Sequence, residues 1–209
     1  MDRKGILLVV SGFSGAGKGT LMKELVSRYD NYALSISATT RSPREGEVDG
    51  REYFFRTKEE FEQMIADDAL IEHACYVGNY YGTPRAYVEE QLALGRDVIL
   101  EIEIQGALQI KKRFPDTLLL FVSTPDAETL KNRLIGRGTE SLEVVEKRLS
   151  RASEEAEGIE NYDYFIINDD LDTCVTQVHQ IIQGEHSRVS RNLELINTIK
   201  KDISKFQKG

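Results

Sequence analysis

The chain has 209 residues, 40% of them apolar and 30% charged, a balance typical of a soluble globular protein with one core and room for inserted subdomains. Its net charge of −8 disfavours a general nucleic-acid or acidic-membrane binder. The apolar run at residues 6–10 is too short for a membrane span or a signal peptide. We therefore expect a cytoplasmic protein without a nucleic-acid or membrane partner. Cys75 and Cys174 lack metal-ligand or redox spacing.

The beginning of the chain predicts a strand, a loop and a helix. Residues 6–10 are continuously apolar and rich in branched side chains, which indicates a strand buried on both faces. Residues 20–28 carry apolar side chains at helical spacing. Between them, Gly12, Gly17 and Lys18 satisfy G-x-x-x-x-G-K in the strand–loop–helix context that this phosphate-binding motif requires.

This loop predicts a site for nucleotide phosphates. Its glycines allow a tight turn that points backbone N–H groups at phosphate oxygens, and the following helix aims its positive end at the same place. Lys18 adds a cation for the β- and γ-phosphates. Gly19 replaces the Ser or Thr that usually contacts Mg²⁺, so either Thr20 takes that contact or phosphates and water hold the ion. The predicted ATP-binding residues of the loop are Gly12, Phe13, Ser14, Gly15, Ala16, Gly17, Lys18, Gly19 and Thr20.

Residues 37–83 interrupt the alternation of strands and helices with short polar and aromatic pieces. We expect an inserted subdomain with short antiparallel strands and one short helix, which begins at a capping box of Thr57 and Glu60. Arg41 and Arg44 lie three residues apart around a proline, and forked guanidinium groups suit phosphate oxygens. A structural alternative for Arg44 is a surface ion pair with a neighbouring glutamate.

The rest of the chain returns to buried strands, predicted at residues 97–102, 117–122 and 164–167. Because helices lie between them, we expect a parallel sheet with right-handed crossovers. Glu101 and Glu103 are predicted on one face at the end of a strand, where parallel sheets bind ligands, although a simply solvated pair is the alternative.

Helix boundaries follow from proline, glycine and apolar spacing. Pro84 suits a first helical position, and Gly136 ends a helix that begins near residue 126. Residues 142–157 predict an exposed amphipathic helix. The last predicted helix, residues 192–206, is expected to pack on the core or on a second copy, which leaves a homo-oligomer open.

Several segments in order resemble the guanylate kinase family, and the resemblance covers residues 12 to about 172. Besides the phosphate loop, they are T-T-R-x-P-R within residues 37–53, G-N-Y-Y-G at 78–82, E-I-E-I-Q-G at 101–106, G-R-G-T at 136–139 and N-D-D-L-D at 168–172. The resemblance implies an α/β fold of the P-loop NTPase type, with a parallel sheet flanked by helices. It also implies a core of residues 1–36, 84–124 and 158–209, a small mixed α/β GMP-binding subdomain of residues 37–83, and a helical lid of residues 125–157.

The resemblance implies transfer of the γ-phosphoryl group of Mg-ATP to GMP or dGMP. It assigns the GMP phosphate to Arg41, Arg44, Tyr53 and Tyr81, the guanine to Ser37, Glu72 and Thr83, further GMP contacts to Glu101 and Glu103, the ATP phosphates to Arg133, Arg137 and Arg148, and the adenine to Asn168. The predicted catalytic residues are Lys18, Arg41, Arg137 and Arg148. The family often has Asp at one or both of positions 101 and 103, and each Glu in this chain is one methylene longer.

Two other functions remain open at this point. The Lys-Gly-Thr form of the loop also resembles adenylate kinases, so an AMP-like acceptor is one alternative. Glu72 weighs against it, because one carboxylate accepts both the N1–H and the 2-amino group of guanine, whereas adenine lacks this donor pair. Guanylate-kinase-like domains also serve as non-catalytic interaction modules, but those tend to lack an intact phosphate loop, and this chain keeps Gly17 and Lys18.

Overall fold

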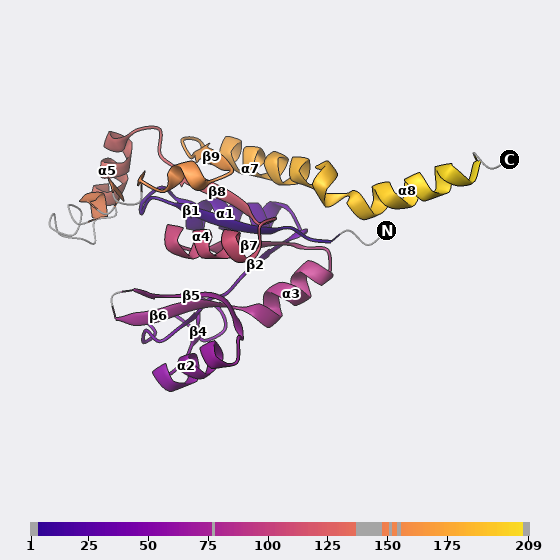
Figure 1. The fold of residues 1–209 in the computed structure, drawn as a ribbon. Helices are drawn as coiled ribbons and strands as arrows, with labels where there is room; N and C mark the ends of the chain where they lie inside the picture. Colours follow the sequence, from indigo (N-terminus) through magenta and orange to yellow (C-terminus); the bar gives the residue numbers. More distant parts are fainter. Residues whose placement is uncertain (1–3, 77, 137–147, 151, 154–155, 207–209) are drawn as a thin grey trace.

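The computed structural model describes residues 4–76, 78–136, 148–150, 152–153 and 156–206 (Figure 1). Its main sheet has five strands in the order β2-β7-β1-β8-β9, and all of its pairs are parallel. In chain order these strands are β1 (Leu7–Gly12), β2 (Tyr32–Leu34), β7 (Asp97–Glu101), β8 (Leu118–Ser123) and β9 (Tyr164–Ile167). The predicted parallel sheet is confirmed. Strand β2 was not predicted, because its three residues are too few to show an apolar pattern.

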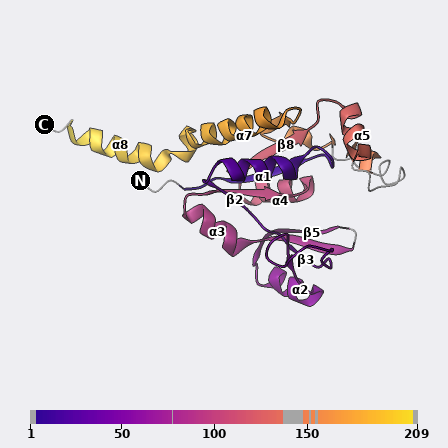
Figure 2. The ribbon, with the colours of Figure 1, turned by 180° about the vertical axis from the view of Figure 1, so that it is seen from behind.

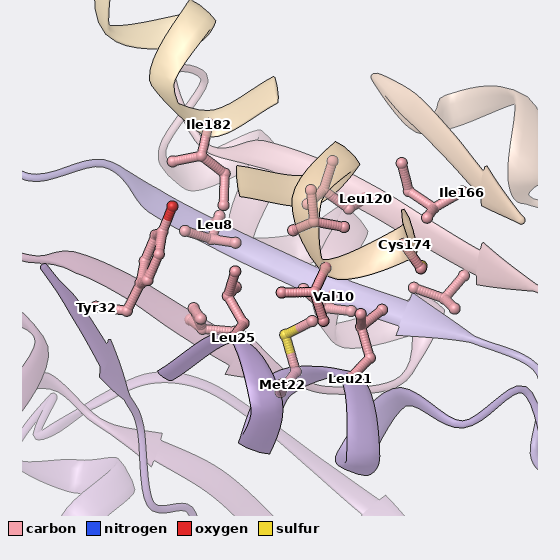
Figure 3. Packing of buried hydrophobic residues seen from close by; sticks show 14 of the residues in the cluster. Leu8, Val10, Leu21, Met22, Leu25, Tyr32, Leu120, Ile166, Cys174 and Ile182 are labelled. Carbon is pink, nitrogen blue, oxygen red and sulfur yellow. The ribbon is translucent and has the colours of Figure 1, made fainter. Parts of the chain in front are cut away.

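Helices cover both faces of this sheet, because successive strand residues point to opposite sides. The main-sheet helices are α1 (Lys18–Arg28), α3 (Arg85–Ala93), α4 (Ile104–Arg113), α5 (Ala127–Gly136) and α7 (Leu171–His186). Leu8 and Val10 of β1 pack with side chains of α1 and α7, such as Leu21 and Cys174 (Figure 3). Val9 faces the other side, where the packed side chains come from α3 and α4. The buried strand residues therefore anchor the elements on which the site is built.

A second sheet, in the order β4-β3-β6-β5, forms a separate lobe beside the main one (Figure 1). Its elements are β3 (Ala38–Thr39), β4 (Phe54–Phe55), α2 (Lys58–Ala66), β5 (Leu70–Tyr76) and β6 (Asn79–Pro84). The predicted capping box opens α2: Thr57 Oγ1 accepts from the Glu60 backbone N–H at 3.1 Å, and the Glu60 carboxylate accepts from the Thr57 N–H at 2.8 Å. The expectation of antiparallel strands is wrong for β3 and β4, which pair in parallel.

Two further sequence predictions need correction, and one lies largely outside the described residues. Pro84 is the last residue of β6 and the N-cap of α3, so the helix begins one residue later than predicted. Glu103 does not continue strand β7 but forms the N-cap of α4, because the strand ends at Glu101. The amphipathic helix predicted at residues 142–157 falls mostly on residues that the structure does not describe. Gly136 is the last described residue of α5, so the predicted end of this helix stays a prediction.

The chain finishes in a long helix that projects from the main lobe. After a 3₁₀ turn, Val189–Arg191, helix α8 (Leu193–Lys205) extends away from the sheet, as both orientations show (Figures 1 and 2). None of its residues is buried, so of the two predicted alternatives packing on the core is wrong, and packing on a second copy stays a prediction. Among the described residues, no helix has the length and apolar character to cross a membrane.

Candidate functional site

The glycine-rich loop connects the end of β1 to the start of α1, as the motif predicts. Gly12 and Gly17 have φ of 152° and 90°, a conformation that favours glycine. At Gly12 a Cβ atom would lie 2.1 Å from the backbone oxygen of Val122, so only glycine allows β8 to approach this closely. The loop backbone is thus shaped by its own glycines and by the strand beside it.

Lys18 curls back over the loop that precedes it. Its Nζ donates to the carbonyl oxygens of Gly12 at 2.5 Å and Phe13 at 3.2 Å. Inside the loop, the Ala16 N–H donates to the same Phe13 oxygen at 3.0 Å, which closes a tight turn. The ammonium group therefore lies on the loop itself, at the first turn of α1, where the helix dipole also favours anions.

Asn168 braces the phosphate loop from the end of β9. Its side chain is buried, and Nδ2 donates to the backbone oxygen of Ala16 at 2.8 Å, while its backbone N–H donates to the Ser123 carbonyl oxygen at 2.8 Å. A Cβ atom at Gly17 would lie only 2.6 Å from Nδ2, so the amide and the glycine fit together. The predicted contact of Asn168 with adenine stays a prediction, and the contact that the structure shows is with the loop.

On the donor and acceptor roles that the resemblance implies, Asn168→Ala is expected to lower kcat/KM for ATP about tenfold, because losing one buried hydrogen bond costs about 1–1.5 kcal/mol. Initial rates at varied ATP and saturating GMP measure this effect, with Asn197→Ala on the exposed surface of α8 as the matched control. A bracing role predicts equal losses with every donor triphosphate. A loss confined to adenine nucleotides would instead favour the contact with the base.

A cavity of about 870 Å³ lies between the phosphate loop and the second sheet. Ser14 and Lys18 line it from the loop. Six of the predicted GMP-binding residues also line it: Ser37, Tyr53, Glu72, Tyr81, Glu101 and Glu103. The fold therefore brings residues far apart in the sequence to one space, with the loop on one side and the predicted acceptor residues on the other.

Glu72 is a buried carboxylate at the wall of this cavity, with 7% of its surface exposed. The hydroxyl of Thr83, which is fully buried beside it, donates to Glu72 Oε1 at 2.7 Å. A Cβ atom at Gly106 would lie 3.1 Å from Glu72 Oε2, so this glycine makes room for the second carboxylate oxygen. The structure thus places Thr83 behind Glu72, where it orients the carboxylate.

Burial raises the pKa of Glu72 above its ordinary value of 4.5, and the hydrogen bonds from Thr83 offset this only partly. A carboxyl whose pKa is raised by folding stabilises the fold below its ordinary pKa, and this contribution is lost as the pH rises through the raised value. At neutral pH the buried charge therefore lowers the stability of the protein. A site that keeps a buried carboxylate at a cost to stability is a candidate for binding a ligand whose hydrogen-bond donors pair with that carboxylate.

Glu72→Gln is expected to unfold at a higher urea concentration than the wild type at neutral pH, because the amide still accepts from Thr83 but carries no charge. The difference should shrink as the pH falls toward 4.5, where the wild-type carboxyl becomes neutral. Urea titrations over this pH range measure it, with Glu62→Gln on the exposed surface of α2 as the control. A stability difference that does not change with pH would contradict the burial argument.

Arg41 is held by a carboxylate and by aromatic rings, one of which, that of Tyr53, belongs to a residue that lines the cavity. Its Nη2 lies 2.9 Å from Glu47 Oε1, and its guanidinium carbon lies 5.3 Å from the centroid of the Tyr53 ring and 5.8 Å from that of Phe55. Glu47 also accepts from the backbone N–H of Arg44 at 2.7 Å. Glu47 therefore orders the turn from Arg41 to Arg44. Its side chain forms an ion pair with Arg41, whereas its contact with Arg44 is with the backbone N–H.

The glutamate that ends β7 lies beside the phosphate loop. A Cβ atom at Gly19 would lie 4.0 Å from both carboxylate oxygens of Glu101, so this carboxylate faces the first turn of α1. Although Glu101 keeps part of its surface exposed, partial desolvation by the surrounding protein raises the pKa of its carboxyl, Lys18 lowers it, and Glu103 raises it further. Thr20 is exposed in the first turn of α1. Glu101 and Thr20 are thus two oxygen donors next to the loop.

The predicted lid residues are only partly described. Arg133 Nη1 lies 3.5 Å from the Ala16 oxygen, and Arg148 Nη1 donates to the Ser14 hydroxyl at 3.3 Å, so both guanidinium groups reach the loop. Arg137 lies outside the described residues. The two described arginines therefore lie on the side of the loop where donor phosphates are expected.

Some contributors to the site had no signal of their own in the sequence. Gly106 belongs to a quoted motif, but only the fold shows that it makes room for Glu72. Glu47 shows its role only through its distance to Arg41. Ser35 lines the cavity, and its buried hydroxyl has no hydrogen-bond partner among the described residues, which makes this residue a further candidate for contact with substrate.

A glycine-rich loop at the carboxyl end of a central parallel strand, with a cationic side chain folded over it, defines a nucleotide-binding protein of the P-loop NTPase fold. The guanylate kinase family model matches residues 4–185. Guanylate kinases of Streptococcus thermophilus and Bacillus cereus are 51% and 52% identical over 192 and 191 residues, with 91% of this chain and 92% and 93% of theirs covered. The chain therefore belongs to the guanylate kinase family.

A solved structure supports the same assignment. The crystal structure of guanylate kinase from Anaplasma phagocytophilum matches with a TM-score of 0.73 and 30% identity, covering 90% of this chain and 89% of that one. The predicted fold class, family and guanylate kinase function are confirmed.

Proposed function

We propose that the chain transfers the γ-phosphoryl group of Mg-ATP to GMP or dGMP across the cavity between its phosphate loop and its second sheet. The observation that carries this proposal is that Lys18 and Glu72 line the same space of about 870 Å³. A cation for the donor phosphates and a carboxylate for the acceptor base thus face one reaction volume. An AMP-like acceptor is disfavoured, because adenine would leave Glu72 buried without its donors.

The acceptor is proposed to lie against the second sheet. Glu72 would accept from the N1–H and 2-amino groups of guanine, with Ser37 beside it, while Thr83 keeps the carboxylate oriented from behind. The GMP phosphate would be held by the Arg41 and Arg44 guanidinium groups together with the hydroxyls of Tyr53 and Tyr81. The Tyr53 and Tyr81 rings lie 6.1 Å apart, so the two hydroxyl-bearing side chains are close neighbours.

Arg41 has to exchange partners in this scheme. In the described structure its guanidinium group is paired with Glu47, and the side chain of Arg41 keeps only 16% of its surface exposed. An incoming phosphate would take over this guanidinium group, while the aromatic rings of Tyr53 and Phe55 keep it in place. Glu47 thus holds the arginine ready in the absence of the acceptor.

The donor is proposed to lie on the phosphate loop, residues 12–20. The backbone N–H groups and Lys18 would surround the β- and γ-phosphates, and Arg133 and Arg148 would approach from the lid side. Arg137 is proposed to join them. The charge that develops on the transferred group would then be balanced by fixed cations, so no covalent intermediate is required.

The residues next to the loop fit a magnesium ion brought in with ATP. Among the described residues, no three His, Cys, Asp or Glu side chains form a metal cage. Mg²⁺ is commonly held by one or two protein oxygens together with substrate phosphates, and the Thr20 hydroxyl and the Glu101 carboxylate offer such oxygens beside the loop. When bound, the ion would neutralise charge on the phosphates. Because Gly19 has no hydroxyl and faces Glu101, the carboxylate is a second candidate beside Thr20.

Each part of the fold is proposed to have its own role in the reaction. We assign residues 37–83 to acceptor binding, residues 125–157 to a lid over the donor, and the rest to the nucleotide-binding core. Closure of such parts excludes water, which would otherwise hydrolyse ATP. Because ATP and GMP are soluble nucleotides, we place the activity in the cytoplasm, with no need for a nucleic-acid or membrane partner.

An acceptor panel at fixed Mg-ATP tests the proposal through coupled detection of ADP. We expect turnover with GMP and dGMP to exceed turnover with AMP, UMP and CMP. Faster turnover with AMP would overturn the choice of acceptor, and no turnover with any nucleotide would favour a binding module.

A further inference from the structure

Strand β5 carries one extra residue in the segment that holds Glu72. Between its pairing with Pro84 and its pairing with Gly82, both in β6, β5 advances by three residues instead of two. The extra residue makes a β-bulge of residues 71–72. Bulges turn side chains in directions that a regular strand does not allow, and they are frequent beside active sites. This bulge therefore sets the direction of the Glu72 side chain.

Both residues of the bulge face helix α4, which lies beside β5 (Figure 1). Ile71 is buried in the same apolar cluster as Ala107 and Ile110 of α4. A Cβ atom at Gly106 of the same helix would lie 3.1 Å from Glu72 Oε2. In a regular strand, neighbouring side chains point to opposite faces, so the bulge is what brings both of them to one helix. The orientation of the carboxylate therefore depends on how the bulge is held against α4.

The bulge is held by the last residue of α4. Arg113 Nη1 donates to the backbone oxygen of Ile71 at 3.3 Å, and this oxygen belongs to the peptide bond that joins Ile71 to Glu72. Arg113 Nη2 donates to both carboxylate oxygens of Asp68, at 2.8 and 2.9 Å. One guanidinium group thus connects α4 to the bulge and to the turn that precedes β5.

Asp68 fixes the arginine from that turn. Its φ of 50° lies in the left-handed region, and no other described non-glycine residue has a positive φ. Arg85, the first residue of α3, donates from Nε to the Asp68 backbone oxygen at 2.8 Å, and its Nη2 lies 2.9 Å from the Asp68 carboxylate. The side chains of Arg113 and Asp68 keep 44% and 67% of their surface exposed, so their ion pair adds little to stability. Its effect is on geometry, because it keeps the guanidinium group beside Ile71.

We propose that Arg113 is a positioning residue for recognition of the acceptor base: its hydrogen bond to the Ile71 oxygen holds the bulge so that the Glu72 carboxylate faces guanine. The inference rests on the proposed function, which assigns Glu72 to the base. Arg113 does not line the cavity, so it acts through Glu72 and not by contact with a nucleotide. Helix α4 then serves the acceptor site at both of its ends, since Glu103 at its N-cap lines the cavity.

The kinetics of Arg113→Met test this role, with Lys112→Met on the same exposed end of α4 as the matched control. Methionine keeps an unbranched side chain but donates no hydrogen bond. The KM for GMP is expected to rise about tenfold, with kcat and the KM for ATP near their wild-type values, because only binding of the base is weakened. The preference for GMP over inosine monophosphate, which lacks the 2-amino group, should fall in the same variant. Lys112→Met should leave all of these quantities unchanged.

A double-mutant cycle shows whether Arg113 acts through Glu72. In a Glu72→Gln background, Arg113→Met should raise the KM for GMP less than about twofold, because the carboxylate that the arginine positions is already gone. An equal increase of the KM in both backgrounds would overturn the positioning role.

Two further results would also overturn this role. The first is wild-type kinetics of Arg113→Met while Glu72→Gln loses its preference for GMP. The second is a loss of kcat with every acceptor together with unfolding at a lower urea concentration, which would assign Arg113 to folding. In both cases the wild type still prefers GMP, so the proposed function stands. A wild type that prefers another acceptor would instead overturn the proposed function and this inference with it.

Discussion

Lys18→Ala is expected to lower kcat about 1,000-fold, which corresponds to about 4 kcal/mol of lost transition-state stabilisation. The ammonium group is held on the loop by the Gly12 and Phe13 oxygens, at 2.5 and 3.2 Å, so it is in place before the phosphates arrive. A preorganised charge stabilises the transferring group without having to be reoriented during the reaction. Its loss therefore affects turnover more strongly than nucleotide binding, to which the loop backbone also contributes.

The backbone of the loop should survive this substitution. Its shape depends on Gly12, on Gly17 and on the hydrogen bond from Asn168 to the Ala16 oxygen. The lysine side chain adds to these its hydrogen bonds to the Gly12 and Phe13 oxygens. Coupled ADP release at saturating GMP gives kcat, and binding of a fluorescent ATP analogue shows that the loop remains intact. Lys23→Ala, exposed on the same helix, is the matched control. Full activity of Lys18→Ala would mean that phosphoryl transfer does not use this loop.

Features of the fold that depend on neighbouring residues could be predicted from the sequence. The phosphate loop, the capping box at Thr57 and strand β9 are local, because a few consecutive residues contain the turn glycines, the cap or the apolar run that causes them. The boundary at Glu103 was not predicted, since alternation along a strand does not show where the chain turns into a helix. The polypeptide leaves the strand after Glu101, and the two carboxylates then line the cavity from different elements.

Features that depend on contacts between residues far apart in the sequence could not be predicted and are seen only in the structure. The hydrogen bond from Thr83 to Glu72 joins two adjacent strands of the second sheet, and the bond from Asn168 to Ala16 joins segments 152 residues apart. Such pairs follow from strand order, which apolar patterns do not specify. The resemblance implies that Thr83 and Asn168 contact the bases, which stays a prediction, and the structure shows in addition that each holds a neighbouring group. Side chains that orient other side chains have no motif of their own.

Glu72→Gln is expected to lower kcat/KM for GMP about 100-fold while leaving the low value for AMP unchanged or higher. A charged carboxylate accepting from guanine contributes about 1.5–3 kcal/mol for each hydrogen bond, and about 2.7 kcal/mol corresponds to a factor of 100. In the variant an amide N–H₂ would face one of the guanine donors. AMP gains from the change, because adenine no longer leaves a buried charge unpaired.

Inosine monophosphate separates the two hydrogen bonds, because hypoxanthine keeps the N1–H but lacks the 2-amino group. The wild type should prefer GMP to this acceptor, and Glu72→Gln should lose most of that preference if both donors bind the carboxylate. Initial rates with GMP, inosine monophosphate and AMP on the wild type, Glu72→Gln and the exposed control Glu62→Gln measure the effect. An unchanged GMP preference in Glu72→Gln would remove Glu72 from base recognition.

The same substitution is expected to raise stability at neutral pH, which makes the loss of activity interpretable. A variant that unfolds less readily than the wild type cannot have lost GMP turnover through misfolding, so a reduced kcat/KM reports on the bond to the base. The burial of Glu72, which is 7% exposed, is the common cause of both effects. It makes the charge unfavourable in the free protein and makes the carboxylate select an acceptor base that supplies hydrogen-bond donors. We therefore expect the gain in stability and the loss of GMP preference to appear together and to vanish together when the pH falls far enough to protonate the wild-type carboxyl.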